Sequence, residues 1–315
     1  MLNRRYLRIK VYQSLYAYWQ SDSSNAARIE KELFLSIERT FDLYVGLLML
    51  FGEMRRLAEQ RIEDRLKKHL PTAEDLSASR RFVDNPVLVL LSEGPRLQAD
   101  ADKRRVSWGG HNEMLSKLYK QFESSEAFKA YMALPTTTPK KDQAIIADLF
   151  LEHIANYEQL HDHYEAKSIY WLEDLDLACS LVKRTIEEVR PAEGDLSLND
   201  LTREPAEEQS FVSTLYRRAI DQGEEHEAAI AARASNWESD RIAITDMILM
   251  KMALTEAREF PEIPVKVTLN EYIEIAKAYS TPKSKNFING ILDKLFAEMK
   301  ENGQIRKVGR GLLES

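Results

Sequence analysis

Apolar side chains recur along this chain at steps of three and four residues, the period of a helix with one buried face. The clearest run covers residues 29–50, where the apolar positions are Ile29, Leu33, Ile37, Phe41, Tyr44 and Leu48. Residues 143–163 and 168–190 show the same spacing. Strand-like alternation is scarce, and no repeat of fixed period is visible. The pattern therefore predicts an all-α protein.

The C-terminal third predicts three consecutive helices. In the first, within residues 236–260, an apolar stripe runs through Ala243, Met247, Met250 and Leu254. The second is expected to begin at Thr268, because Thr268 and Glu271 have the spacing of a capping box. Its expected inward-facing residues are Leu269, Tyr272, Ile273 and Ala276.

The third of these helices begins with an unusual distribution of charge. Ser280 or Thr281 followed by Pro282 predicts a helix start, since proline loses no hydrogen bond there and a preceding hydroxyl caps free N–H groups. The first turn then carries Lys283 and Lys285, although a helix N-terminus is the positive end of its dipole. The expected core residues are Phe287, Ile288, Ile291, Leu292 and Leu295. An anion bound at this helix start would explain the two lysines.

Composition bounds the class of protein and its compartment. The chain has 315 residues, 44% hydrophobic and 30% charged, a balance typical of soluble globular proteins. Its longest apolar run, residues 41–51, is too short to cross a bilayer, so we expect a buried helix and no membrane partner. The single cysteine, Cys179, excludes disulfides within the chain, and the basic N-terminus shows neither an apolar stretch of signal-peptide length nor a small-residue cleavage site. Both features favour a cytoplasmic protein.

One acidic stretch divides the chain. Residues 191–210 read PAEGDLSLNDLTREPAEEQS and contain two prolines. This composition predicts a linker between two helical subdomains, residues 1–200 and residues 201–315.

The distribution of charge suggests a local cationic surface. The net charge of −7 argues against indiscriminate nucleic-acid binding, which needs a broadly basic surface. Residues 1–20 nevertheless contain no acid and four cations, which are Arg4, Arg5, Arg8 and Lys10.

Signals of enzymatic chemistry are missing from the sequence. The chain contains no GxGxxG, no GxxxxGK[ST] and no HExxH motif. His153, His161 and His163 lack the helical spacing of metal ligands, because residues i and i+2 point apart on a helix. Cys179 lies in an apolar helix, where packing is its expected role. We therefore expect no catalytic site, no cofactor and no metal.

Four segments resemble the NusB family of transcription antitermination factors. They are RRYLRIKVYQSLYAYW (residues 4–19), NWESDRIAITDMIL (236–249), VTLNEYIEIAKAY (267–279) and SKNFINGILDKL (284–295). The resemblance covers residues 1–50 and 211–298. Residues from about 55 to 200 have no counterpart and are expected to form a helical insertion that enlarges the N-terminal subdomain.

The resemblance implies an all-helical, two-subdomain RNA-binding protein. It would pair with the ribosomal protein NusE, bind the boxA element of ribosomal RNA leaders, and help the RNA polymerase antitermination complex to resist termination. The implied RNA-binding residues are Arg4, Arg5, Arg8, Gln13, Lys283, Ser284 and Phe287, and Lys285 joins them because it shares the first turn of the helix. The implied NusE-binding residues are Tyr16 and Asp246, expected on one exposed patch.

Each of these residues also has a structural interpretation. Lys283 and Lys285 could be solvated on a polar face, and Phe287 could pack in the core instead of stacking on a base. Arg8 lies in the first helix alongside Tyr12, which predicts a shared exposed face. Trp237, Asp240 and Arg241 are expected to hold helix ends together. The alternative function is a helical protein-interaction scaffold that does not bind RNA.

Overall fold

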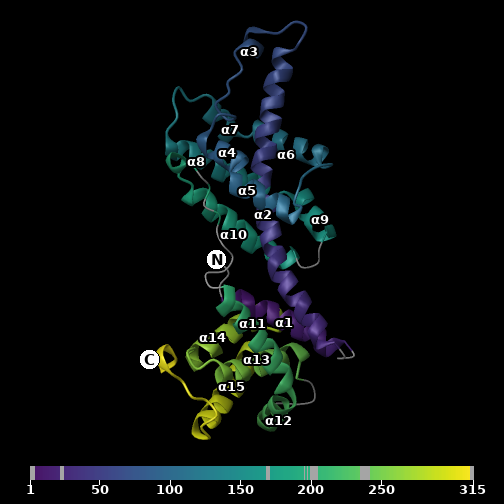
Figure 1. Cartoon of the computed structure of the whole chain (residues 1–315), viewed down its shortest axis with the longest axis vertical. Coiled ribbons are helices and arrows are strands. Elements are labelled where there is room, and N and C mark those ends of the chain that lie inside the picture. Colours follow the sequence, from purple (N-terminus) through teal and green to yellow (C-terminus); the bar gives the residue numbers. More distant parts are fainter. Residues whose placement is uncertain are drawn as a thin grey trace. The chain divides into compact units, whose positions relative to one another are not determined.

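The computed structural model of the chain describes residues 4–21, 25–167, 171–194, 196, 198, 205–234 and 242–312. All regular elements in these ranges are helices, so the predicted all-α fold is confirmed (Figure 1). Trp237, Asp240 and Arg241 lie outside the described residues.

The chain divides into two compact units. The inserted unit comprises residues 38–201, and the terminal unit comprises residues 2–37 together with residues 202–315. The sequence predicts one subdomain over residues 1–200, whereas the contacts assign residues 2–37 to the same unit as the C-terminal helices. The boundary falls inside one continuous helix, where no glycine, proline or change of composition marks it.

The terminal unit contains α1 (Arg4–Gln20), the first part of α2 (Ala26–Leu66), α11 (Pro205–Asp221), α12 (Gly223–Ala234), α13 (Ile244–Glu259), α14 (Val265–Tyr279), α15 (Ser284–Glu301) and η4 (Gly309–Leu312). The inserted unit contains the rest of α2, α3 (Ala73–Leu76), α4 (Pro86–Glu93), α5 (Pro95–Arg104), α6 (Asn112–Ser124), α7 (Glu126–Met132), α8 (Pro139–Asp148), η1 (Leu149–Ile154), α9 (Glu158–Lys167), α10 (Trp171–Glu188) and η2 (Pro191–Glu193).

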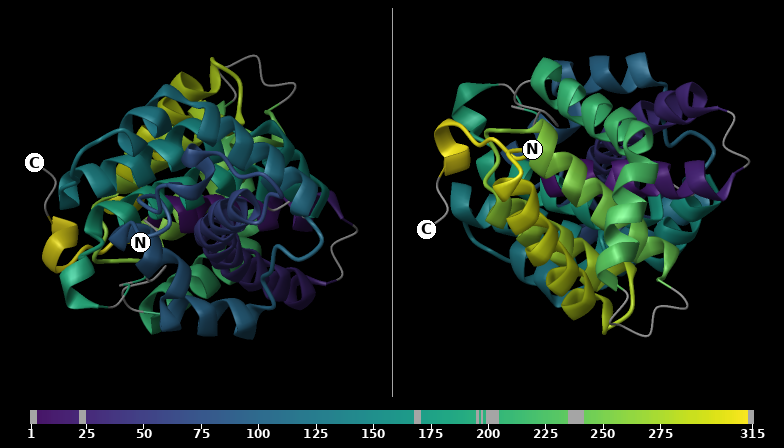
Figure 2. Two further views of the ribbon diagram at one scale, coloured as in Figure 1. Left: turned by 90° about the horizontal axis from the view of Figure 1, so that it is seen from above. Right: turned by 90° about the horizontal axis from the view of Figure 1, so that it is seen from below.

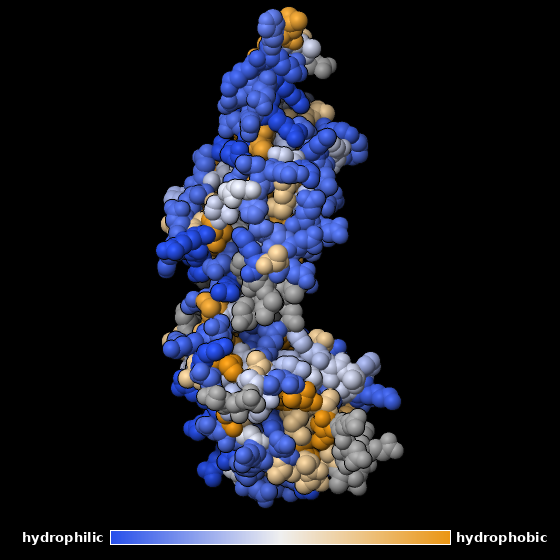
Figure 3. Space-filling view, turned by 90° about the vertical axis from the view of Figure 1, so that its right-hand side faces the viewer, coloured by the Kyte–Doolittle hydropathy of each residue, from blue (hydrophilic) through white to orange (hydrophobic). Residues whose placement is uncertain are grey.

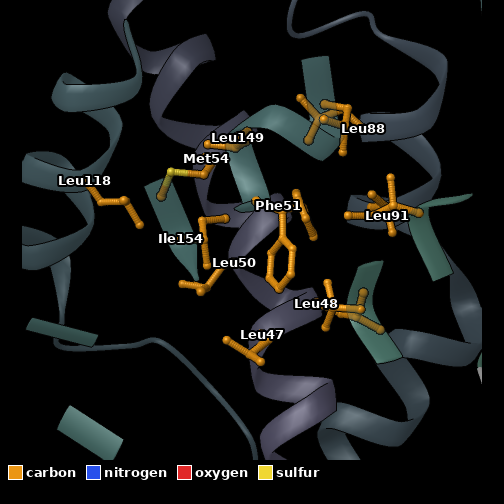
Figure 4. Close-up of a cluster of buried hydrophobic side chains, with 14 of the residues drawn as sticks. Leu47, Leu48, Leu50, Phe51, Met54, Leu88, Leu91, Leu118, Leu149 and Ile154 are labelled. Carbon is orange, nitrogen blue, oxygen red and sulfur yellow. The ribbon is translucent and has the colours of Figure 1, made fainter. Parts of the chain in front are cut away.

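The core of the inserted unit forms around α2. The apolar run 41–51 is buried on nearly every side, as predicted. Figure 4 shows α2 side chains, among them Phe51, meeting leucines of α4 and α6 and the apolar residues of η1. Two buried hydrogen bonds add specificity: Thr40 Oγ1 donates to Asp174 Oδ2 at 2.8 Å, and the hydroxyls of Tyr44 and Thr185 lie 2.5 Å apart.

The predicted helix over residues 143–163 is interrupted. After α8 the chain widens into the π-helical η1, where Ala155 N donates to Phe150 O at 2.8 Å. The extra residue in this turn lets Leu149, Phe150 and Ile154 all face the core. The chain then turns before α9 begins at Glu158. A count of apolar spacing does not detect such a change of period.

Part of the predicted linker is core. Leu196 and Leu198 are 1% and 3% exposed and belong to the apolar cluster of the inserted unit. Residues 205–210 already lie in α11. The boundary between the two units, at residues 201 and 202, falls within the predicted linker, but other parts of this stretch belong to the core of the inserted unit and to α11.

The terminal unit is arranged around α13. This helix contacts α1, α11, α12, α14 and α15, which Figures 1 and 2 show around it. Every residue from Ile248 to Ala257 is buried. The buried surface of α13 is therefore wider than the predicted single stripe. Met250 and Leu254 are buried as expected, and so are the residues between them. Ala243, which was also expected in the stripe, is exposed.

Two predicted helix starts differ from the observed ones. α14 begins at Val265, so Thr268 lies inside the helix, where its hydroxyl donates to Glu256 Oε1 at 2.9 Å. Glu271 binds Arg5 and does not cap the helix. α15 begins at Ser284, and Pro282 lies in the preceding turn. At α14 the hydroxyl and the carboxylate make tertiary contacts in place of the predicted cap, and at α15 Ser280 donates to Asp246 while the Thr281 and Ser284 hydroxyls contact each other.

The surface of the inserted unit carries dispersed apolar side chains. On the face shown in Figure 3, hydrophilic residues cover most of the inserted unit. Its exposed large apolar residues are Leu66, Leu70, Leu76 and Leu151. Among the described residues no helix is both long enough and apolar enough to span a membrane.

Candidate nucleic-acid interface

Arg4 and Arg5 begin α1 at the surface of the terminal unit. Arg4 forms an ion pair with Glu207 and approaches Glu262 at 3.8 Å. Arg5 donates two hydrogen bonds of 2.8 Å to the Glu271 carboxylate. These hydrogen bonds raise the pKa of Arg5 and lower the pKa of Glu271. Both guanidinium groups are partly exposed, so a phosphate could reach them only in competition with a carboxylate.

Arg8 lies one turn further along α1 and is buried. Its side chain is 3% exposed, and the guanidinium donates to both oxygens of Glu256, at 2.6 and 2.7 Å. Glu256 also accepts hydrogen bonds from Thr268 and Tyr272. Burial lowers the pKa of Arg8, but the charge and hydrogen bonds of Glu256 outweigh this effect and raise it.

The expectation of a shared exposed face for Arg8 and Tyr12 is therefore wrong, because both side chains are buried. A guanidinium enclosed by a carboxylate and core residues does not reach solvent. Its role in this arrangement is to join α1 to α13 and α14.

A chain of hydroxyl groups shapes the turn before α15. Ser284 is 3% exposed, and its hydroxyl lies 2.9 Å from Ser280 Oγ and 2.8 Å from Thr281 Oγ1. Ser280 Oγ donates to Asp246 Oδ1 at 2.5 Å. The predicted exposure of Asp246 is wrong, since only 5% of the residue is accessible. Ser284 likewise does not present its hydroxyl to a ligand, and both residues hold the turn.

Lys283 and Lys285 flank the start of α15 and are exposed. In the part of the chain that the structure describes, neither lysine forms an ion pair. The backbone N–H of Ser284 donates to Thr281 O at 3.0 Å, and that of Asn286 to Lys283 O at 3.2 Å. The attraction for an anion here therefore comes from the two ammonium groups and the helix dipole, with little help from free N–H groups.

Phe287 occupies the boundary between core and surface. Its neighbours Ile288 and Ile291 are fully buried, whereas Phe287 is partly exposed. One part of the Phe287 side chain is therefore buried in the terminal unit, and another part is accessible to solvent.

Aromatic contacts place the middle of α1 beside the turn. The Tyr12 ring lies 5.4 Å from the ring of Tyr279, the last residue of α14, and 6.4 Å from the ring of Tyr16. Tyr16 is 39% exposed and Gln13 is partly exposed. Gln13 and Tyr16, which sequence reasoning assigned to functional surfaces, lie on the same helix as Tyr12, which contacts the end of α14. Tyr279 was missed, although it directly precedes the Ser-Thr-Pro signal.

Comparison with known proteins identifies relatives of this chain. The NusB family profile matches residues 175–297, a range that includes the three C-terminal motifs but not residues 1–50. Three relatives carry the name transcription antitermination protein NusB. The protein from Salinibacter ruber is 39% identical over 138 residues, which are 42% of this chain and 86% of the relative.

The relative from Chloroherpeton thalassium is 43% identical over 104 residues, 33% of this chain and 49% of the relative. The relative from Geobacter sulfurreducens is 35% identical over 109 residues, 35% of this chain and 79% of the relative. No solved structure matches the chain significantly.

Proposed function

The chain belongs to the NusB family of non-enzymatic transcription antitermination factors. From this membership we propose that the terminal unit binds boxA-type single-stranded RNA together with the ribosomal protein NusE. The complex would act on RNA polymerase during transcription of ribosomal RNA leaders. The observation that carries this proposal is the pair of exposed lysines without ion-pair partners at the start of α15.

The RNA strand would contact the surface formed by the start of α15 and the exposed side of α1. Lys283 and Lys285 neutralise phosphates without first breaking an internal ion pair. Arg5 contributes by exchanging the Glu271 carboxylate for a phosphate, and Arg4 can do the same at Glu207. Gln13 and the accessible part of Phe287 supply hydrogen bonding and stacking to unpaired bases. Arg8 does not contact RNA in this proposal; its hydrogen bonds to Glu256 hold α1 against α13 beneath this surface.

Removing the two lysines tests the RNA contact. Lys283→Ala with Lys285→Ala should weaken binding of a boxA-type RNA and reduce the magnitude of the log K against log salt slope by about 1 to 1.5, since each single-strand phosphate contact contributes about 0.7. Fluorescence anisotropy at several salt concentrations measures both quantities.

The chain offers a matched control in the inserted unit. Lys140 and Lys141 are exposed and lie in the first turn of α8 after a Thr-Pro pair, so Lys140→Ala with Lys141→Ala makes the same charge change at an equivalent position. This control should leave affinity and slope unchanged. Equal behaviour of the two double variants would contradict specific binding at α15.

The proposed NusE contact uses Tyr16. Of the two partner-binding residues implied by the family resemblance, Tyr16 has an exposed side chain, whereas Asp246 is enclosed. Aromatic side chains are frequent anchors of protein interfaces. Tyr16→Ala should lower the affinity for NusE at least tenfold without altering RNA affinity in the absence of NusE. Undiminished capture of NusE by the folded variant would refute the contact.

A helical protein-interaction scaffold without RNA binding is the second candidate. The observation that favours it is the pairing of Arg4, Arg5 and Arg8 with carboxylates, which leaves few free cations on α1. Binding of NusE combined with no measurable boxA affinity, alone or in the presence of NusE, would establish this alternative.

A further inference from the structure

The inserted unit contains a small pocket lined by cationic side chains. It has a volume of about 130 Å³ and lies among the middle of α2, the connection from α5 to α6, and the end of α9. The lining residues used below are Asp42, Arg104, Arg105, Ser107, His163 and Lys167.

The charges around this pocket do not balance. Arg104 donates to Asp42 Oδ1 at 2.8 Å, and this is the pocket's carboxylate. Arg105 and Lys167 form no ion pair with any described residue. His163 adds no charge near neutral pH: burial, then the positive charges of Lys167 and His111, lower its pKa to about 4. Three cations and one carboxylate thus surround the same small space.

The backbone at Arg105 is a second, independent observation. Arg105 ends α5 in a left-handed conformation with φ 56° and ψ 38°, the C-terminal position where glycine is preferred. Every other described residue with positive φ is a glycine. Arginine is strained in this backbone conformation, which glycine adopts freely. The strained residue is also one whose side chain carries a positive charge beside the pocket.

Arg104 provides a third observation. Its Nε is buried and has no hydrogen-bond acceptor among the described residues. A buried N–H donor of this kind is normally satisfied. The guanidinium carbon lies 4.3 Å from the centre of the Phe41 ring, which holds the cation beside the pocket.

We propose that this pocket binds a phosphate monoester or free phosphate through Arg104, Arg105, Lys167 and the Ser107 hydroxyl. Guanidinium groups recognise phosphate oxygens with short, charge-assisted hydrogen bonds. The volume is below the roughly 300–1,000 Å³ of pockets that enclose drug-sized ligands, so the pocket holds the phosphate group and not an attached nucleoside. The inference rests on the inserted unit alone and is independent of the RNA contact proposed for the terminal unit.

Titration calorimetry with inorganic phosphate and the full chain, in low-salt buffer without other multivalent anions, tests the site. Arg105→Gly should bind phosphate at least tenfold more weakly while melting at the same or a higher temperature, because glycine adopts the left-handed conformation without strain. Lys103→Ala is the matched control, since Lys103 is exposed, lies two residues away and does not line the pocket.

A gain in affinity provides a check that misfolding cannot imitate. Asp42→Asn removes the carboxylate that competes for Arg104, so phosphate should bind several-fold more tightly. Absence of phosphate binding by the wild-type chain, or equal affinities of the wild type and Arg105→Gly, would overturn the proposal.

Competition distinguishes the two sources of phosphate. A short oligoribonucleotide unrelated to boxA is tested with a 5′-phosphate and with a 5′-hydroxyl. Displacement of inorganic phosphate by the first oligonucleotide alone assigns the site to RNA 5′ ends, and displacement by neither assigns it to free phosphate. Equal displacement by both would contradict the proposed recognition of a terminal or free phosphate.

Discussion

Buried cations in the terminal unit are held by specific partners. Arg8 pairs with Glu256, and Lys251 donates to Glu227 Oε2 at 2.6 Å while lying 4.7 Å from the Trp19 ring. Taking both charges of the Arg8–Glu256 pair out of water is costly, so this pair adds little net stability compared with apolar residues. Removing one partner is different, because the other charge then stays buried without compensation.

Arg8→Ala is therefore expected to lower the free energy of unfolding by about 3–5 kcal/mol. Arg5→Ala, which removes the same type of group from a partly exposed ion pair on the same helix, should cost less than about 1 kcal/mol. Urea-induced unfolding followed by circular dichroism measures both values. Similar losses for the two variants would show that burial of the Arg8–Glu256 pair is unimportant.

At the scale of elements, the proposed interface depends on contacts made behind it. The turn from α14 to α15 is held by Ser280, Thr281 and Ser284, and this hydroxyl chain ends on Asp246 of α13. α1 is joined to α13 by Arg8 and to the end of α14 by Tyr12. The positions of Lys283 and Lys285 thus follow from residues that an RNA strand would not touch.

Asp246→Ala should consequently weaken boxA-type RNA binding, and it should also destabilise the protein by about 1.5–3 kcal/mol, the contribution of a hydrogen bond to a charged group. Asp246→Asn keeps an acceptor for Ser280 and should restore most of the RNA affinity. NusE binding by the folded variants should be unchanged. Loss of NusE binding in Asp246→Asn with normal stability would instead make Asp246 a partner contact.

At the scale of the whole molecule, two apolar cores form in one chain. The inserted unit buries Phe51 and its neighbours around α2, and the terminal unit buries α13. Units with separate cores commonly unfold in separate transitions, so a single two-state transition is not expected.

Phe51→Ala should shift one calorimetric transition, since truncating a buried phenylalanine costs about 3–5 kcal/mol. The transition of the terminal unit and the affinity for boxA-type RNA should be retained. Measurement of heat capacity and of RNA binding on the same preparation checks this. Loss of both transitions together would show that the two units fold as one.

Local sequence patterns were sufficient for some features of this protein. Helical periodicity predicted the all-α fold and the buried run 41–51, and the family motifs predicted membership of the NusB family. The exposure of Lys283 and Lys285 agreed with the sequence pattern, and that of Tyr16 agreed with the family resemblance. The helical features depend on residues close together along the chain, because side chains three and four positions apart lie on the same face of a helix.

Tertiary structure decided the rest. Arg8, Ser284 and Asp246 look like surface residues in sequence, yet each is buried by partners on other helices. The assignment of residues 2–37 to the C-terminal helices and the convergence of Arg104, Arg105 and Lys167 on one pocket also join distant segments. The physical reason is that a polar group is buried only where another part of the fold supplies a hydrogen-bonding or charged partner. Local periodicity does not reveal that partner.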